Sequence, residues 1–160
     1  MNIKLFVPLG TQKFPFGRLI MALNDLVDNG VYAPDEIVMQ SAMYPVEPKF
    51  NHVGLIPVEE FNHYIQEAEV VITHSGVNSI ISSMQLGKPL VVVPRLYEYG
   101  EHVDNHQVEI AELMSIKYDV LILMEMKNLK ATIDAALTHE YKHWQSHKEE
   151  LVNAVRGLIV

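Results

Sequence analysis

Two polar stretches of the sequence carry the residue types best suited to binding an anion and a sugar. In the first, residues 70–79, an apolar run stops at a turn that contains Gly76 and continues as a helical pattern. The start of a helix directs free backbone N–H groups and the positive end of the helix dipole at one point, where a phosphate binds well. The second, residues 94–107, gathers amide, imidazole and carboxylate side chains, which together hydrogen-bond several hydroxyls. These stretches predict a phosphate site beside a sugar site.

Both stretches also have simpler interpretations. Ser75 or Ser79 could merely cap the helix, because serine is a common capping residue. The turn also lacks the second glycine and the lysine of a P-loop and the G-x-G-x-x-G pattern, which argues against a P-loop kinase. In the second stretch, capping accounts for at most one polar residue and solvated charge accounts for Glu98 and Glu101. The polar excess that remains favours a ligand.

A zinc site is a third candidate. Residues 139–143 read His-Glu-Tyr-Lys-His, and in H-E-x-x-H two histidines one helical turn apart hold zinc while the glutamate acts as a base. The longer metzincin continuation is absent, and Glu149 and Glu150 are close on the same predicted helix. We favour a polar outer face of the last helix, and a zinc peptidase that uses His139, Glu140 and His143 remains a remote alternative.

No cofactor or divalent metal is expected at the phosphate site. Asp-x-Asp, which would hold a cation on a nucleotide diphosphate, does not occur in the sequence. Backbone dipoles, with Arg95 or Lys13, would then neutralise a diphosphate.

The composition predicts one soluble, cytoplasmic domain that spans residues 1–160. The chain is 49% hydrophobic and 20% charged, which is sufficient for a sizeable core. Its formal net charge of -8, without a basic cluster, argues against a nucleic-acid partner. Cysteine is absent, so thiolate sites and disulfides are excluded. No apolar run reaches the ~18 residues of a membrane-spanning helix, and residues 1–10 are too short for a signal peptide.

Short apolar runs alternate with helical patterns along the whole chain. This order predicts a doubly wound parallel sheet of α/β class, covered by helices on both faces. The turns at residues 10–13, 74–79 and 95–107 would then share one edge of the sheet and face one ligand. The predicted strands are 3–9, 36–40, 52–56, 70–73, 89–93 and 120–123, and the predicted helices are 16–27, 57–68, 77–87, 103–114 and 126 to about 159, with a break near Thr138.

At these residues the sequence resembles the family 28 glycosyltransferases, in particular small bacterial capsule and exopolysaccharide subunits that correspond to the carboxyl-terminal half of a GT-B enzyme. The resemblance covers nearly the whole chain. Its motifs together are specific for the family, whereas each motif alone is a weak signal. They are Val7-Pro8-Leu9-Gly10-Thr11-Gln12 with Phe14-Pro15-Phe16 and Arg18-Leu19, Ile72-Thr73-His74-Ser75-Gly76 with Asn78-Ser79-Ile80, Gly87-Lys88-Pro89, Val93-Pro94-Arg95 and residues 99–107. The two-subunit enzyme that adds N-acetylglucosamine to dolichol-linked carriers is a eukaryotic relative.

The resemblance implies a Rossmann-like domain that binds a UDP-sugar and works only with a second protein. That partner, similar to the amino-terminal half, is membrane-anchored and holds a lipid-linked acceptor, so this chain would lie peripherally at the inner face of the plasma membrane. By position, the residues implied for UDP and its diphosphate are Gly10, Thr11, Gln12, Val58, Ser75, Gly76, Val77, Asn78, Ser79 and Ser82. Those implied for the donor sugar are Glu101, His102, Asp104, Asn105, His106 and Gln107.

Two positions depart from the family pattern. Ser75 replaces a second glycine, a small change that leaves the turn intact. Ser82 stands where the family has a glutamate that holds the ribose hydroxyls, and loss of that charge-assisted contact costs about 1.5–3 kcal/mol of nucleotide affinity. Either another acid such as Glu101 compensates, or donor binding is weak, or activity is lost.

The sequence thus predicts the donor-binding subunit of a two-component, inverting, metal-independent hexosyltransferase of capsule or exopolysaccharide synthesis. The leaving diphosphate would be stabilised by the turn at residues 76–79. The catalytic base is expected on the partner, with His74 and His102 as other proton carriers. A non-catalytic scaffold or nucleotide-sensing subunit is the alternative that Ser82 favours.

Overall fold

Six parallel strands form one sheet in the order β3-β2-β1-β4-β5-β6. The computed structural model describes residues 2–142 and residue 156. The strands are β1 (Leu5–Pro8), β2 (Ile37–Gln40), β3 (Asn51–Val53), β4 (Val70–Thr73), β5 (Leu90–Val92) and β6 (Leu121–Ile122). The longer helices are α1 (Gly17–Asp28), α2 (Val58–Glu67), α3 (Val77–Gln85), α4 (His106–Tyr118) and α5 (Leu129–Thr138), with short turns η1 (Pro34–Glu36), η2 (Tyr97–Tyr99) and η3 (Met126–Asn128).

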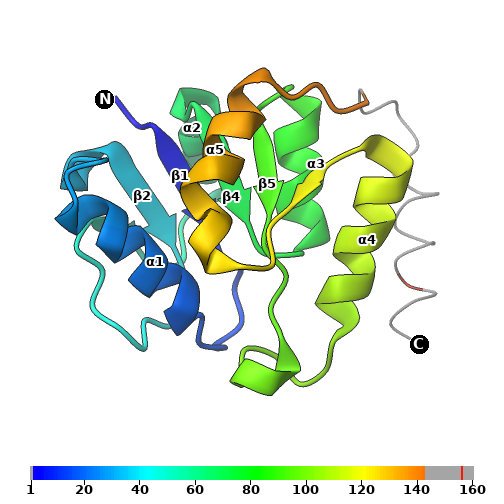
Figure 1. Cartoon of the computed structure of the whole chain (residues 1–160), viewed down its shortest axis with the longest axis horizontal. Coiled ribbons are helices and arrows are strands. Elements are labelled where there is room, and N and C mark those ends of the chain that lie inside the picture. Colours follow the sequence, from blue (N-terminus) through cyan, green and yellow to red (C-terminus); the bar gives the residue numbers. More distant parts are fainter. Residues whose placement is uncertain (1, 143–155, 157–160) are drawn as a thin grey trace.

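The central strands are apolar throughout because helices cover both faces of the sheet. On one face α1 and α5 pack against alternate strand residues such as Leu5 and Val7. On the other face α2, α3 and α4 pack against residues such as Phe6 and Val71. Figure 1 shows α1 and α5 crossing in front of the strands, with α2 and α3 beyond them. The predicted doubly wound, Rossmann-like α/β fold is confirmed.

The switch point of the sheet, where the order of successive strands reverses, lies between β1 and β4. Strands β1 to β3 extend to one side and β4 to β6 to the other, so the helices that follow β1 and β4 cover opposite faces. Beyond the carboxyl ends of two such strands a crevice opens, and open α/β folds bind ligands there. The turns after β1, β4 and β5 meet at this edge.

Several element boundaries differ from the sequence prediction. Strand β3 ends at Val53, and helix α4 begins at His106 and continues to Tyr118. The later start has a local cause, because the Asp104 carboxylate accepts a hydrogen bond from the His106 N–H (3.0 Å) just before the first turn. The last predicted helix breaks at Thr138, as expected, and residues 139–142 are not helical. Its continuation, 143–155 and 157–160, lies outside the described residues.

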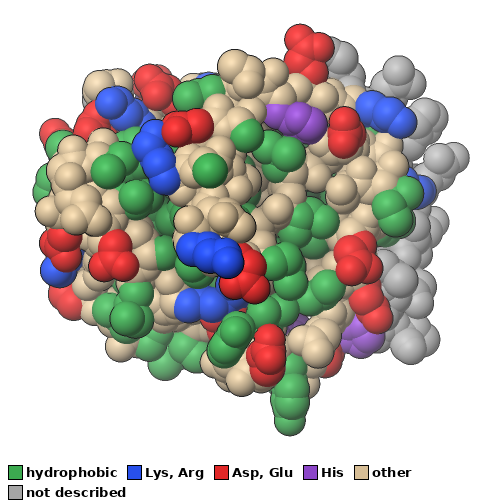
Figure 2. All heavy atoms as spheres, in the orientation of Figure 1, with side chains coloured by type: hydrophobic (Ala, Val, Ile, Leu, Met, Phe, Trp, Pro, Cys, Tyr) green, Lys and Arg blue, Asp and Glu red, His purple; other side chains and the backbone are tan. Residues whose placement is uncertain are grey.

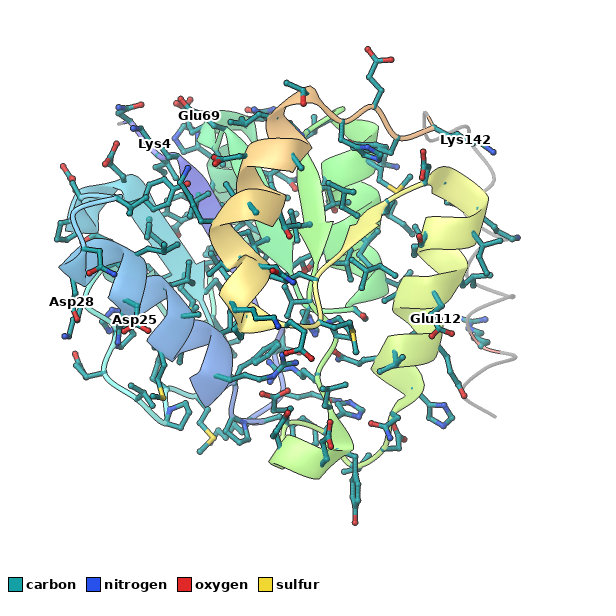
Figure 3. All side chains as sticks on the ribbon, in the orientation of Figure 1. Lys4, Asp25, Asp28, Glu69, Glu112 and Lys142 are labelled. Atoms are coloured by element: carbon teal, nitrogen blue, oxygen red, sulfur yellow. The ribbon has the colours of Figure 1, made fainter. Side chains whose placement is uncertain are left out.

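The chain has a formal net charge of -8. Figure 2 shows carboxylates and basic side chains interspersed on one face, without an extended basic area. The residues labelled in Figure 3, such as Asp25, Asp28 and Glu112, point away from the sheet. Within the part of the chain that is described, no helix is long and apolar enough to cross a membrane.

Candidate functional site

A cleft of about 730 Å³ opens at the carboxyl edge of the sheet, at the switch point between β1 and β4. We call it the switch-point cleft. Its lining includes an apolar wall from the β3–α2 connection and α2, the turn between β4 and α3 with one side of α3, and residues of the loops after β1 and β5. The lining residues are Leu9, Gly10, Thr11, Gln12, Phe14, Gln40, Leu55, Ile56, Val58, Phe61, Asn62, His74, Gly76, Val77, Asn78, Ser79, Ile81, Ser82, Gln85, Arg95, His102 and Gln107.

The first turn of α3 faces the cleft with its backbone donors available. Gly76 is the residue before the helix, and no side chain makes a capping hydrogen bond there. The first internal bond of the helix runs from the Ile80 N–H to the Gly76 carbonyl (3.1 Å). The preceding N–H groups of a helix have no intrahelical acceptor. The capping interpretation is therefore wrong for this helix, whose start can accept an anion.

The imidazole of His74 lies directly over the backbone of Gly10 and Gly76. A Cβ atom at Gly10 would stand 2.8 Å from His74 Nε2, and one at Gly76 would overlap the same ring atom. Gly10 also has φ +88°, a conformation that other residues adopt only with strain. Both glycines are needed because any side chain would displace the imidazole.

Gln107 joins the turns after β4 and β5 through one amide group. Its Oε1 accepts hydrogen bonds from the Ser75 N–H (3.3 Å) and the Arg95 N–H (2.9 Å). Its Nε2 donates to Nδ1 of His74 (3.1 Å). Because backbone N–H groups only donate, the amide oxygen must face them and the amide nitrogen must face the imidazole. Gln107 therefore holds the turn between β4 and α3 against the loop after β5.

The same contact determines the protonation of His74. Since Nδ1 accepts a hydrogen bond from Gln107, the neutral ring carries its proton on Nε2. Burial is the main cause that lowers the pKa of His74 to about 3, with smaller contributions from Arg95 and His102. His74 is then a neutral donor at physiological pH and cannot accept a proton as a catalytic base.

The lowered pKa of His74 makes stability depend on pH. The unfolded chain binds this proton near pH 6.5, whereas the folded chain binds it only near pH 3. The contribution of His74 is therefore complete above pH 6.5 and is lost as the pH falls toward 3. We expect the free energy of unfolding to fall more steeply between pH 6.5 and 4 in the wild type than in His74→Gln, as measured by urea unfolding. Equal slopes would contradict the burial of a neutral imidazole.

Arg95 is buried beneath the cleft and is not a free cation. Its NH2 group donates to the Leu9 carbonyl (2.7 Å), and NH1 donates to the Phe14 (3.0 Å) and Pro15 (3.2 Å) carbonyls. Burial lowers the pKa of Arg95 to about 10, so the guanidinium stays charged at neutral pH. The sequence suggested direct neutralisation of a diphosphate, but the main contact of Arg95 is with the loop after β1.

His102 lines the cleft and forms a pair with Asp104. Its Nδ1 lies 3.1 Å from the Asp104 carboxylate, and its ring packs on Phe14 with centroids 4.9 Å apart. The carboxylate favours a proton on Nδ1, which leaves Nε2 as an acceptor. Of the two imidazoles that line the cleft, His102 is the one that is paired with a carboxylate.

The residues predicted to hold the sugar do not all face the cleft. His102 and Gln107 line it, whereas Asp104, Asn105 and His106 are not among its lining residues. The Asn105 side chain accepts a hydrogen bond from the Tyr97 N–H (3.0 Å), and His106 pairs with Glu109 (2.8 Å).

Glu101 lies apart from the switch-point cleft. It is buried and forms an ion pair with Arg18 (2.9 Å), and it accepts the Leu96 N–H (3.0 Å). With Arg18 it lines a second hollow of about 550 Å³. Glu101 therefore does not supply a carboxylate near Ser82.

The predicted nucleotide residues mostly line the cleft. Gly10, Thr11, Gln12, Val58, Ser82 and residues 76–79 do so. Ser75 does not. Its N–H is bonded to Gln107, and its hydroxyl is buried without a hydrogen-bond partner among the described residues.

The prediction missed Phe14, Gln40 and Asn62, which also line the cleft. The signal for Gln40, a polar residue that ends an apolar run, was present in the sequence. Its amide donates to the Gly10 carbonyl (2.9 Å) and holds the glycine turn.

The H-E-x-x-H residues do not have the geometry of a zinc site. That motif needs a helix to bring its histidines to one side, but residues 139–142 are not helical. His139 Nε2 instead contacts the Asp119 carbonyl (2.6 Å), and His143 lies outside the described residues. Among residues 2–142 and 156, no cluster of three His, Cys, Asp or Glu could hold a metal ion.

Comparison with known proteins gives one family match. Residues 18–159 match the glycosyltransferase family 28 C-terminal domain. The UDP-N-acetylglucosamine transferase subunit ALG13 of Candida albicans is 29% identical over 92 residues, 58% of this chain and 30% of that protein. The NDP-glycosyltransferase YjiC of Bacillus subtilis is 26% identical over 88 residues, 45% of this chain and 22% of that protein. The chain spans about a third or less of these curated relatives.

Solved structures show the same fold. A solution structure of ALG13 superposes with a TM-score of 0.58 at 20% identity and covers 96% of this chain and 95% of its own. The spinosyn forosaminyltransferase SpnP superposes with a TM-score of 0.52 at 14% identity over 98% of this chain and 39% of its own. The sheet is thus similar to part of a GT-B glycosyltransferase.

Proposed function

Because the chain belongs to the glycosyltransferase family 28 C-terminal domain family, we propose that it is the donor-binding subunit of a two-component glycosyltransferase. The enzyme would be inverting and metal-independent, and would transfer a hexose from a UDP-sugar to a lipid-linked acceptor in capsule or exopolysaccharide synthesis. The acceptor would be held by a second, membrane-anchored subunit similar to the amino-terminal half of a GT-B enzyme. This chain would then lie peripherally at the inner face of the plasma membrane.

The observation that carries the proposal is the switch-point cleft with the uncapped start of α3 at its centre. Following the sheet order, the β3–α2 connection lies at one end, the turn between β4 and α3 in the middle and the loop after β5 at the other end. An apolar wall, a set of backbone donors and a polar loop suit a base, a diphosphate and a sugar in that order. A nucleoside diphosphate sugar fits this arrangement.

The chemistry follows from what these groups stabilise. An acceptor hydroxyl attacks the anomeric carbon, the bond to the diphosphate oxygen breaks, and negative charge develops on the leaving diphosphate. The N–H groups at the start of α3 and the Nε2–H of His74 would stabilise that charge. Since these donors are already oriented in the folded chain, little reorganisation is needed during the reaction.

The proton of the acceptor hydroxyl needs a separate acceptor. His74 is unsuited, because its Nδ1 is bonded to Gln107 and its Nε2 carries the proton. The base is proposed to come from the partner subunit, with His102 and Asp104 as the pair in this chain that can take up a proton.

Metal independence is proposed from the donor groups of the cleft. Magnesium prefers oxygen ligands that include carboxylates. None of the described residues that line the cleft is an aspartate or glutamate. The phosphate charge would therefore be balanced by backbone dipoles and by the buried Arg95 below them.

A non-catalytic scaffold or nucleotide-sensing subunit is the second candidate. Ser82 favours it, because this residue lines the cleft and cannot make the charge-assisted contact of a carboxylate. Calorimetric titration with UDP and several UDP-sugars separates the two functions. A scaffold need not bind any of them, whereas a donor subunit must.

The split enzyme predicts that this chain alone transfers no sugar and that the reconstituted pair does. The measurement is transfer of radiolabelled hexose from UDP-sugars to membrane lipid, with each subunit alone and with both together. Robust transfer by the isolated chain would refute the two-component proposal.

The variant Asn78→Asp tests whether transfer by the pair depends on the start of α3. The substitution preserves size and places a carboxylate in the first turn of α3, where negative charge suits the helix dipole. The folded state should therefore keep its stability while a diphosphate is repelled. Transfer by the pair should fall with the thermal midpoint unchanged. Unaltered transfer would mean that the donor diphosphate binds elsewhere.

A further inference from the structure

The switch-point cleft lacks carboxylates in a chain rich in them. The sequence has 20 Asp and Glu residues, yet none of the described residues that line the cleft is acidic. Its polar side chains are amides, hydroxyls, imidazoles and one guanidinium. The nucleoside part of a donor must therefore be recognised by neutral groups.

The ribose position follows from the arrangement of α2 and α3. The apolar wall at Leu55, Ile56 and Val58 lies at the start of α2, and α2 packs beside α3. A base on this wall and a diphosphate at the start of α3 place the ribose between the two helices. Ser82, one helical turn beyond Asn78 and Ser79, and Gln85, one turn further, face that space.

Ser82 discriminates only weakly between a ribose with both hydroxyls and one that lacks the 2′-hydroxyl. A carboxylate can accept hydrogen bonds from both vicinal hydroxyls, and a site built this way rejects an analogue that lacks one of them, because a charged acceptor is left unpaired. The Ser82 side chain is only half-buried, so its hydroxyl can turn to water when a substrate hydroxyl is missing. Loss of the 2′-hydroxyl should then cost one ordinary hydrogen bond.

We propose that this chain accepts 2′-deoxyribonucleoside diphosphate sugars, such as thymidine diphosphate sugars, in addition to UDP-sugars. The inference rests on the proposed function, since it assigns the nucleotide class of the same donor site. With the base on the apolar wall, the methyl group of thymine would contact apolar side chains.

The test compares UDP with dUDP, which differ only in the 2′-hydroxyl, by calorimetric titration of the full chain. We expect the Kd for dUDP to lie within about tenfold of that for UDP, the range of a single neutral hydrogen bond. A preference for UDP of more than about tenfold overturns the inference and leaves the proposed function intact. If neither nucleotide binds, the proposed function fails and the inference fails with it.

Ser82→Glu and Ser82→Gln form the matched pair of variants. Glutamate restores a bidentate acceptor, so the preference for UDP over dUDP should widen by about tenfold or more, whereas glutamine should leave it narrow. The ratio removes the general repulsion between the new carboxylate and the diphosphate, because both nucleotides carry the same charge. An unchanged ratio in a folded Ser82→Glu variant, checked by its thermal midpoint, contradicts the ribose position. If Ser82→Glu does not fold, the ratio of the Kd values of the wild-type chain for dUDP and UDP still tests the inference.

Discussion

Replacing Gln107 by leucine is expected to lower the free energy of unfolding by about 2–4 kcal/mol, because two buried N–H groups lose their acceptor. These are the N–H groups of Ser75 and Arg95. The same change frees the His74 ring, which lies over Gly10 and Gly76 in the turns after β1 and β4. UDP affinity should therefore fall by at least about tenfold. Urea unfolding and calorimetry measure the two effects.

Gln107→Glu is the control that separates the two roles of the amide. Glutamate keeps the acceptor for both N–H groups but cannot donate to His74 while ionised. The variant should retain most of the stability lost in Gln107→Leu and should raise the pKa of His74 from its value of about 3, because a carboxylate beside Nδ1 favours the imidazolium. NMR titration of the ring checks this. A Gln107→Leu variant as stable as the wild type would show that the amide does not hold the turns together.

Arg95→Met should have the second large effect, a loss of about 3–5 kcal/mol of unfolding free energy, because three carbonyls lose their donor. Those carbonyls belong to Leu9, Phe14 and Pro15, so the loop after β1 would lose its attachment to the loop after β5. Arg95→Lys should recover only part of the loss, since an ammonium group cannot reproduce the planar fork of a guanidinium. Urea unfolding and limited proteolysis near residue 12 measure these changes.

Lys13→Met is the matched control for Arg95. Lys13 is a cation in the same loop, but its side chain is exposed. Its removal should change stability by no more than about 0.5 kcal/mol. If Arg95→Met and Lys13→Met lower the free energy of unfolding equally, Arg95 contributes through its net charge. Its hydrogen bonds to the loop would then not be its main contribution to stability.

Much of the fold could be predicted from local patterns. Strand β4 is an apolar run of four residues, Val70–Thr73, and α3 follows with apolar residues at helical spacing, because each element depends on neighbours along the chain. The carboxyl ends of parallel strands share one edge, so the meeting of the turns at Gly10 and Gly76 followed from the fold class alone. Ser82 could also be predicted to lie at the site from its position in the motif, and it lines the cleft.

The partners of the polar side chains could not be predicted from the sequence. Glu101 and Gln107 both lie in the polar stretch 94–107. Glu101 nevertheless pairs with Arg18, 83 positions away, while Gln107 contacts His74, 33 positions away. These contacts depend on the order of the strands in the sheet and on which face each loop crosses. The sequence by itself determined the alternation of strands and helices and the edge of the sheet where the cleft opens. Only the tertiary structure decided which polar groups face the cleft, because burial and hydrogen bonding between distant segments leave some side chains free for a ligand and engage others in holding the loops.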